Sequence, residues 1–192
     1  MLALWTVAAY FLGTFPSAQI VARAHGVDIT TVGSGNPGAS NVTRALGWRR
    51  GVWVFVLDAA KGAIATALGL VIFGRPGGFV LGAAAIVGHV FPIQRGFRGG
   101  KGVATGGGVL AVLHPLIALV AAPVWLLVTR LTHKPVVGSI AAIAVVPIGL
   151  AITDAEAWEY WATAFVLLVI VIRHAGNVKR LIRREEHSLR PG

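Results

Sequence analysis

The chain has 192 residues, a length that fits one domain, and 56% of them are hydrophobic while only 12% are charged. Its mean hydropathy of +0.77 is too high for a soluble fold of this size, so the long runs of Leu, Val, Ala and Ile indicate burial in lipid. The absence of cysteine excludes disulfides, thiol catalysis and cysteine-ligated zinc. The net charge is +10, but the basic residues cluster at the ends of apolar runs, which favours a membrane surface over nucleic acid.

Seven apolar stretches predict an all-α, polytopic membrane protein with seven transmembrane helices in a single domain, residues 1–192. The predicted helices cover residues 2–22, 52–73, 78–93, 103–113, 116–131, 136–153 and 158–172. An alternative joins the fourth and fifth over residues 103–131, but at ~1.5 Å per residue that helix would measure roughly 43 Å against a ~30 Å hydrocarbon core. His114-Pro115 in the middle of this stretch favours a break instead.

The distribution of basic residues predicts that the N-terminus lies outside and the C-terminus in the cytoplasm. With seven helices, the inner loops and the C-terminal tail, which runs past Arg190, hold all but two of the 17 Lys and Arg residues. The exceptions are Arg75, in an outer loop, and Lys61, inside the second helix. An acidic outer loop begins at Asp154. Six helices would place basic clusters on both faces, against the positive-inside rule.

The first polar segment is GSGNPGASNVTR, residues 33–44, in which three glycines spell G-x-G-x-x-G: Gly33, Gly35 and Gly38. A dinucleotide site would need a preceding strand and a βαβ unit, and both are missing here. The glycines still allow backbone N–H groups to face an anion, and a short helix over Ala39–Leu46, ended by Gly47, adds its positive end. Hydrogen-bonding side chains stand at Ser34, Asn36, Ser40, Asn41 and Thr43, and Arg44 adds a phosphate clamp. The alternative is a well-capped surface turn.

The second polar segment is GHVFPIQRGFRGGKGVAT, residues 88–105, and it contains a basic glycine loop: Gly99, Gly100, Lys101 and Gly102. It is no Walker A loop, since glycine rather than Ser or Thr follows the lysine. A basic glycine loop that opens a helix, with Thr105 in its first turn, is nevertheless an anion site. The alternative, close helix packing through small residues, accounts for residues 106–108 but not for the basic side chains. His89 is either a packing residue or a base.

Two further groups of polar residues stand out. His174 and Asn177 share one helical face, and the acidic residues Glu185 and Glu186 follow them; a basic amphipathic tail on lipid is the alternative. Asp58 and Lys61, at i and i+3 inside the second helix, are either functional or a mutually neutralising structural pair. No H-E-x-x-H, carboxylate cluster or G-x-S-x-G occurs, so neither a metal nor a cofactor is expected.

Taken together and in this order, GSGNPGASNVTR, GHVFP…GGKGVAT and HAGNVKRL resemble the PlsY family of membrane acyl-phosphate:glycerol-3-phosphate acyltransferases. The resemblance covers most of the chain, and the family's seven-helix layout with the N-terminus outside agrees with the charge-based prediction. Four positions depart from the family pattern: Ser40 for Thr, Arg98 for Lys, Val178 for Ile and Arg184 for a common Gly. The first two keep the chemistry, whereas the last leaves open whether Glu186 is the family's acidic residue.

The resemblance implies transfer of a fatty acyl group from acyl phosphate to the 1-hydroxyl of glycerol 3-phosphate. The products are lysophosphatidic acid and phosphate, in the first step of bacterial phospholipid synthesis. The implied location is the bacterial inner (plasma) membrane, with the active site on the cytoplasmic side. The implied partners are the two substrates and membrane lipid, not nucleic acid, and the oligomeric state stays open.

The resemblance also implies roles for individual residues. Four are catalytic: Ser34, Arg44, His174 and Asn177. Eleven bind substrate: Gly33, Gly35, Asn36, Gly38, Asn41, His89, Gly99, Gly100, Lys101, Gly102 and Thr105. The attacking hydroxyl loses its proton either to His174 or to a phosphate oxygen of the substrate. A transporter for phosphorylated metabolites and an adaptor that binds anionic lipid through its basic tail are the competing interpretations.

Overall fold

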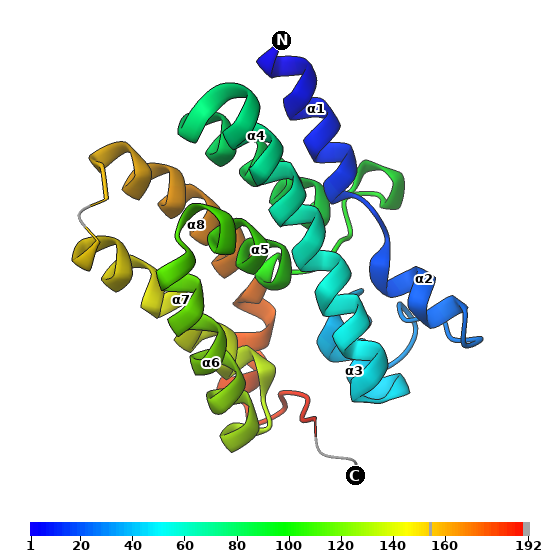
Figure 1. Ribbon diagram of the computed structural model, residues 1–192. Helices are drawn as coiled ribbons and strands as arrows, with labels where there is room; N and C mark the ends of the chain where they lie inside the picture. Colours follow the sequence, from blue (N-terminus) through cyan, green and yellow to red (C-terminus); the bar gives the residue numbers. More distant parts are fainter. Residues whose placement is uncertain (154, 190–192) are drawn as a thin grey trace. The chain divides into compact units, whose positions relative to one another are not determined.

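The computed structural model describes residues 1–153 and 155–189, so Asp154 and Arg190 lie outside the described residues. The chain forms two compact units, the first comprising Met1–Leu113 and the second beginning at His114. The described helices, shown in Figure 1, are α1 Leu2–Gly13, α2 Ser17–Arg23, α3 Ala39–Leu46, α4 Trp48–Val90, α5 Val103–Leu113, α6 Pro115–Thr132, α7 Pro135–Ile152 and α8 Ala157–Ile182, with a 3-10 turn over Ile93–Arg95. The single domain over residues 1–192 stays a prediction.

Helix α4 is a hairpin, not a rod. Gly74 has φ 70° and ψ −168°, a backbone conformation that only glycine adopts readily, and the chain turns back there (Figure 1). A Cβ added at Gly69 would lie 2.3 Å from the carbonyl oxygen of Gly77, and one added at Gly82 would lie 2.6 Å from Thr66 Oγ1. The two arms, residues 48–73 and 75–90, are therefore antiparallel and in close contact. They correspond to the second and third predicted helices.

The other long helices of the first unit pack on this hairpin through small residues. A Cβ added at Gly13 of α1 would lie 2.1 Å from Ala85 O of the second arm. A Cβ added at Gly62 of the first arm would lie 2.2 Å from Thr105 O of α5. Helix α5 packs beside the first arm at Thr105. Its last residue, Leu113, contacts the hairpin turn, because Arg75 Nη1 donates to Leu113 O over 3.2 Å. Glycine at these positions permits the close backbone approach.

The first predicted membrane helix, residues 2–22, is found as a segment long and apolar enough to cross a membrane, but the structure divides it into α1 and α2. The break falls at Phe15-Pro16. Proline has no N–H to donate, and its ring disfavours helical geometry for the residue before it. The junction between α1 and α2 leaves backbone carbonyls without helical partners, and these carbonyls accept hydrogen bonds from side chains of other segments.

The described part of the second unit contains three long helices. Helices α6 and α7 are antiparallel, since Trp125 Nε1 donates to Ser139 Oγ over 3.2 Å while Gly149 packs on Ile117 near the start of α6. Helix α5 ends at Leu113 and α6 begins at Pro115, which confirms the predicted break and excludes one helix over residues 103–131. Helix α8 continues ten residues beyond the predicted end at residue 172 and so carries the polar tail segment on its last turns.

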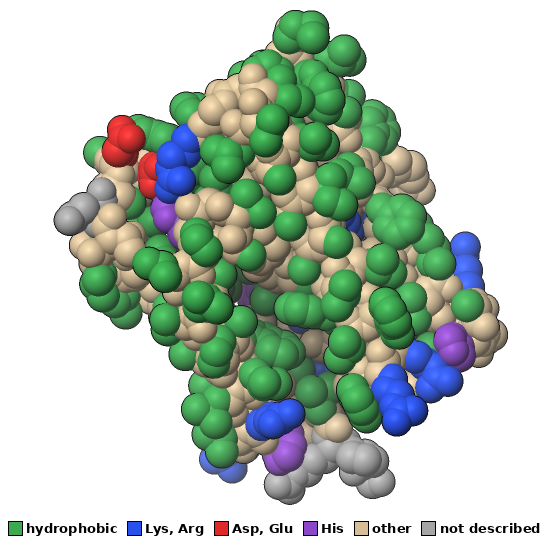
Figure 2. Space-filling view, in the orientation of Figure 1, with side chains coloured by type: hydrophobic (Ala, Val, Ile, Leu, Met, Phe, Trp, Pro, Cys, Tyr) green, Lys and Arg blue, Asp and Glu red, His purple; other side chains and the backbone are tan. Residues whose placement is uncertain are grey.

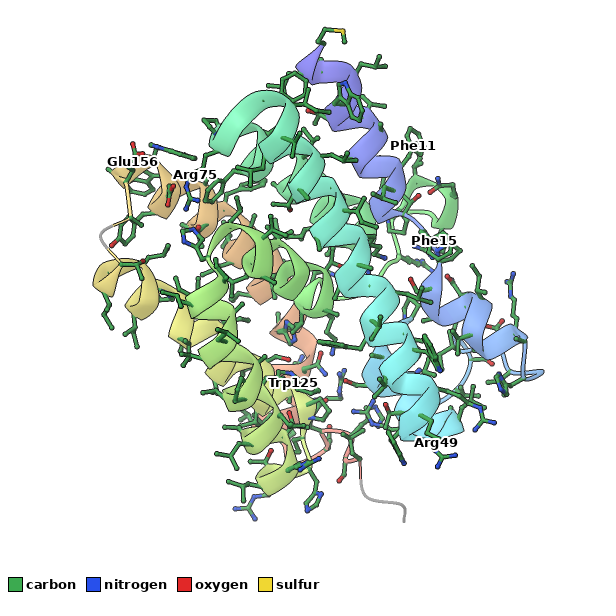
Figure 3. All side chains as sticks on the ribbon, viewed as in Figure 1. Phe11, Phe15, Arg49, Arg75, Trp125 and Glu156 are labelled. Carbon is green, nitrogen blue, oxygen red and sulfur yellow. The ribbon has the colours of Figure 1, made fainter. Side chains whose placement is uncertain are left out.

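Among residues 1–153 and 155–189, five helical segments are long and apolar enough to cross a membrane: Leu2–Arg23, Trp48–Arg95, Pro115–Thr132, Pro135–Ile152 and Ala157–Ile182. Large hydrophobic side chains are exposed along them, and Figure 2 shows hydrophobic side chains spread over the visible face with few charged ones among them. Apolar surface of this extent marks contact with lipid. Arg49 lies at the start of the first arm of α4, and Arg75 lies directly after the turn at Gly74 (Figure 3), so the apolar part of the first arm has a basic residue beyond each end.

Candidate active site

The first glycine segment folds as the sequence suggests. Gly33 and Gly35 have φ of 57° and 64°, in the left-handed region that favours glycine. Helix α3 spans Ala39–Leu46 and ends at Gly47, which confirms the predicted short helix. Gly38 differs from the other two glycines, because it is extended and precedes α3 rather than turning the chain.

Asn41 holds this loop together from inside. It is 1% exposed, and its Oδ1 accepts the N–H of Ser34 over 3.0 Å. Its Nδ2 donates to Ile29 O over 3.1 Å and to Val32 O over 3.0 Å. Both amide hydrogens are therefore used on backbone carbonyls. In the structure Asn41 positions the loop that carries Ser34, and its predicted contact with substrate stays a prediction.

The second glycine segment returns to the end of α4. The N–H of Gly99 donates to Val90 O and that of Gly100 donates to His89 O, each over 3.1 Å. A Cβ added at Gly100 would lie 2.1 Å from His89 Nε2, and one added at Gly99 would lie 2.0 Å from His89 O. Gly102 has φ 86°. The glycines of the loop are therefore required by close packing on His89 and by backbone geometry.

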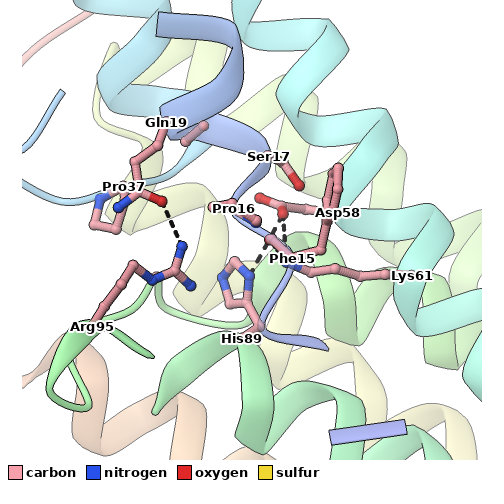
Figure 4. Close-up of a pocket in the computed structure, with 11 residues that line it drawn as sticks. Phe15, Pro16, Ser17, Gln19, Pro37, Asp58, Lys61, His89 and Arg95 are labelled. Carbon is pink, nitrogen blue, oxygen red and sulfur yellow. Dashed lines mark hydrogen bonds and ion pairs between the residues drawn. The ribbon is translucent and has the colours of Figure 1, made fainter. Parts of the chain in front are cut away.

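Both glycine segments border one small pocket in the first unit (Figure 4). Its lining comes from the junction between α1 and α2, from Pro37 of the first segment, from both arms of α4 and from the glycine loop: Phe15, Pro16, Ser17, Ala18, Gln19, Pro37, Asp58, Lys61, His89, Arg95 and Gly100. The cavity measures about 10 Å³, the space of one water molecule. The structure thus brings the two predicted anion-binding segments to one place.

Charged groups dominate this pocket. Asp58 Oδ1 lies 2.8 Å from Lys61 Nζ and 3.6 Å from His89 Nδ1, and all three side chains are buried. Lys61 Nζ also donates to Phe15 O over 3.2 Å, at the junction between α1 and α2. Asp58 and Lys61 are therefore an ion pair, as one of the two sequence interpretations holds, but a pair that also faces His89.

Arg95 and Gln19 line the pocket but were not among the predicted site residues. Arg95 donates to Gln19 Oε1 through Nη1 and to Thr14 O over 3.1 Å through Nη2. Arg95 had only the general signal of a basic residue in an inner loop. Pro16 was the local signal for the junction to which it bonds, because a proline inside an apolar stretch leaves carbonyls in need of donors.

The predicted site residues are divided between the two units. Ser34, Arg44 and Lys101 are half-buried in the first unit, and Thr105 is fully buried there, with its carbonyl packed on Gly62. The two remaining catalytic candidates, His174 and Asn177, belong to α8 of the second unit and are 3% and 4% exposed. Their burial on one helix confirms the predicted shared face.

The second unit fixes these two side chains firmly. His174 Nδ1 lies 2.8 Å from Ile170 O, and since a carbonyl only accepts, Nδ1 carries a proton and Nε2 is the basic nitrogen of the neutral ring. Asn177 Nδ2 donates to Glu186 Oε1 over 2.7 Å, and Arg180 Nε donates to Glu186 Oε2 over 3.0 Å. Glu186 is therefore the acidic residue that organises the tail segment.

Replacing Glu186 with glutamine is expected to lower the free energy of unfolding by roughly 1–3 kcal/mol, since one buried donor loses its carboxylate. Thermal unfolding of the purified protein in detergent measures this, and the rate of product formation reports the loss of Asn177 orientation. The exposed Glu185 is the matched control, and Glu185→Gln should stay within about 0.5 kcal/mol of the parent. Equal effects of the two changes would contradict the assignment of Glu186.

Within residues 1–153 and 155–189, no group of three or more His, Asp or Glu side chains could hold a metal ion. The groups that the described site offers are instead hydrogen-bond donors and cations around two glycine turns. Such a set suits a phosphorylated ligand.

The sequence pattern of the family described as glycerol-3-phosphate acyltransferase matches residues 3–184. The chain belongs to the glycerol-3-phosphate acyltransferase family. A relative of this name in Anaeromyxobacter dehalogenans is 41% identical over 194 residues, which cover 97% of this chain and 96% of the relative. One in Aquifex aeolicus is 37% identical over 181 residues, covering 93% and 94%.

Two crystal structures of PlsY, an integral membrane glycerol 3-phosphate acyltransferase, share this fold at 35% identity, with coverage of 97% of this chain and 94% of theirs. The glycerol 3-phosphate form has a TM-score of 0.92 and the lysophosphatidic acid form one of 0.90. The resemblance to the PlsY family and the helical membrane architecture are therefore confirmed. This glycerol-3-phosphate acyltransferase family member is a multi-pass membrane protein.

Proposed function

We propose that this acyltransferase takes its acyl group from an acyl phosphate and transfers it to the 1-hydroxyl of glycerol 3-phosphate. The observation that carries the proposal is the meeting of two glycine turns at one cationic pocket, in a chain 35% identical to a PlsY solved with glycerol 3-phosphate and with lysophosphatidic acid. Two phosphorylated substrates need cationic groups to hold their phosphates, and the two glycine segments carry Arg44 and Lys101.

The chemistry is an acyl transfer between two oxygens. The hydroxyl oxygen attacks the acyl carbon, an ester bond forms, and the bond from that carbon to the phosphate oxygen breaks, so that phosphate leaves with the electron pair. The hydroxyl proton passes to His174 or to a phosphate oxygen of the substrate. A mixed anhydride has a good leaving group, so positioning and stabilisation of the developing oxyanion supply most of the rate.

Arg44 and Lys101 are the proposed phosphate clamps, while Ser34 and the two glycine turns position the reacting groups. Changing either clamp to alanine is expected to lower kcat/KM at least about tenfold, because a charge-assisted hydrogen bond contributes roughly 1.5–3 kcal/mol. Arg50, exposed and bonded to Leu46 O over 2.9 Å, is the control cation. If both variants kept a turnover and an affinity near those of the parent, Arg44 and Lys101 would not be the phosphate clamps.

The donor is tested directly with purified protein, glycerol 3-phosphate and one of three donors: palmitoyl phosphate, palmitoyl-CoA or palmitoyl acyl carrier protein. Lysophosphatidic acid is expected from palmitoyl phosphate alone. Equal amounts of product from either of the other donors would overturn the proposed donor, while the transfer of an acyl group to glycerol 3-phosphate would still hold. A His174→Ala enzyme with full rate would assign the proton to the substrate phosphate.

We further propose seven membrane crossings, with the N-terminus outside and the site on the cytoplasmic side of a bacterial inner membrane. The five apolar segments support this count once the hairpin α4 is taken as two crossings and the short α5 as another. Since the chain has no cysteine, single cysteines report topology without background. In intact cells an impermeant maleimide should label Glu156→Cys and spare Arg49→Cys until the membrane is permeabilised; the reverse pattern would invert the topology.

A further inference from the structure

We propose that His89 is a positioning residue for the glycine loop, and that the buried Asp58–Lys61 pair acts through His89 to set the affinity for the phosphate group of glycerol 3-phosphate. The inference rests on the proposed function, because it names what holds the phosphate-binding loop in place. It also resolves the choice between a structural and a functional role for the Asp58–Lys61 pair in favour of both.

The first step is the contact between His89 and the loop. The imidazole lies directly against the Cα of Gly100, since an added Cβ there would meet Nε2 at 2.1 Å and Cε1 at 2.7 Å. The backbone of His89 also accepts the N–H of Gly100. His89 is 6% exposed, so its ring has no room to turn away. The position of this ring therefore fixes the position of the loop.

The second step is the restraint on the ring itself. Asp58 Oδ1 faces His89 Nδ1 at 3.6 Å and is held in turn by Lys61 Nζ at 2.8 Å, as the dashed lines in Figure 4 show. A carboxylate on this side favours the proton on Nδ1 and one orientation of the imidazole. Lys61 is anchored by Phe15 O, so the restraint reaches from the junction between α1 and α2 to the glycine loop.

The third step is energetic. A buried ion pair inside an apolar helix hairpin is expensive, and an apolar pair of the same size would often stabilise the fold as well or better. A pair kept only to neutralise itself would have no need to face a third group. Here the carboxylate faces both Lys61 and His89, and the ring faces the loop. The arrangement fits a support for the loop better than a self-contained pair.

The proposal predicts an effect on one substrate only. The glycine loop carries Lys101, the proposed phosphate clamp, so displacement of the loop weakens the binding of glycerol 3-phosphate and leaves the binding of the acyl donor unaffected. In Asp58→Asn and His89→Ala, KM for glycerol 3-phosphate should rise about tenfold, which corresponds to about 1.4 kcal/mol of binding. KM for acyl phosphate and kcat at saturation should change much less. Direct binding of glycerol 3-phosphate to the purified protein, without donor, should weaken equally.

Two comparisons separate positioning from simple destabilisation. His89→Gln keeps an amide near the Nε2 position and should retain more affinity than His89→Ala, and it also serves if the alanine variant fails to fold. Because Asp58 acts through the ring, Asp58→Asn should add no further loss in the His89→Ala background. Fully additive losses would overturn the coupling.

The second unit offers a matched control. His114 Nε2 and Glu159 Oε2 form another buried imidazole–carboxylate pair at 3.6 Å. Glu159→Gln should lower the unfolding temperature as Asp58→Asn does, but leave KM for glycerol 3-phosphate unchanged. If Asp58→Asn and His89→Ala bind glycerol 3-phosphate normally, or raise both KM values alike, the proposal is wrong. A parent protein that neither binds glycerol 3-phosphate nor forms product overturns the proposed function, and this inference with it.

Discussion

Replacing Gly99 with alanine is expected to lower kcat/KM for glycerol 3-phosphate by about 100-fold, the cost of shifting reacting or binding groups by about 1 Å. The added Cβ would lie 2.0 Å from His89 O and 2.7 Å from Val90 O, which are backbone atoms, and 2.6 Å from Pro92 Cδ. None of these atoms can rotate away. The glycine loop must move instead, and steady-state kinetics with purified enzyme measure the result.

Gly107→Ala is the matched control for this change. Gly107 lies in α5, is exposed, and has nothing within 4 Å of an added Cβ. Alanine there should leave the kinetics unchanged and favour the helix by up to about 1 kcal/mol. Gly100→Ala adds a second comparison, because its Cβ meets only ring atoms of His89. His89→Ala should therefore relieve Gly100→Ala in part but not Gly99→Ala; relief of both would contradict the steric explanation.

Replacing Asn41 with alanine is expected to lower the free energy of unfolding by about 3 kcal/mol, since each buried group left without its partner costs roughly 1–3 kcal/mol. The carbonyls of Ile29 and Val32 lose a donor, and the N–H of Ser34 loses its acceptor. Activity should fall with the ordering of Ser34. Chemical denaturation in detergent and the rate of lysophosphatidic acid formation measure the two effects.

Two further variants test this explanation. Asn41→Asp keeps the acceptor for the N–H of Ser34 but loses both donor hydrogens. Compared with Asn41→Ala, it should therefore regain more of the activity than of the free energy of unfolding. Thr30→Ala, in the same loop, removes an exposed side-chain bond to Asp28 that lowers the pKa of that carboxyl. It should change stability by less than about 0.5 kcal/mol. If Thr30→Ala lowered the free energy of unfolding as much as Asn41→Ala does, the loss would come from any change in this loop and not from the hydrogen bonds of Asn41.

The elements that could be predicted carry their signals locally. Gly47 ends α3, His114-Pro115 separates α5 from α6, and apolar runs mark the long helices. The end of α8 was not predicted, because hydropathy reports where apolar side chains stop and not where the helix stops. Polar residues with good helix propensity simply continue it. Pro16 did signal the break between α1 and α2, but the surrounding apolar run outweighed it.

The sequence predicted the two anion-binding segments of the site but not the contacts that bring the pocket residues together. Glycine, Lys101 and Arg44 indicate anion binding wherever they lie together. The contact of Asp58 with His89 has no local signal, since the two residues are far apart in sequence and meet only because α4 folds back at Gly74. The bond from Arg95 to Gln19 likewise depends on how α2 lies beside the end of the hairpin.

The packing of α5 against the first arm of α4 sets the position of the glycine loop along that arm. Thr105 lies beside Gly62, and His89, which supports the glycine loop, faces Asp58. At ~1.5 Å per residue these points lie about 15–20 Å along α4 from Trp48, well inside a helix long enough to cross a ~30 Å core. At the proposed site the water-soluble acceptor would therefore bind beside the membrane-crossing part of α4, where an acyl donor can react without lifting its chain out of the lipid.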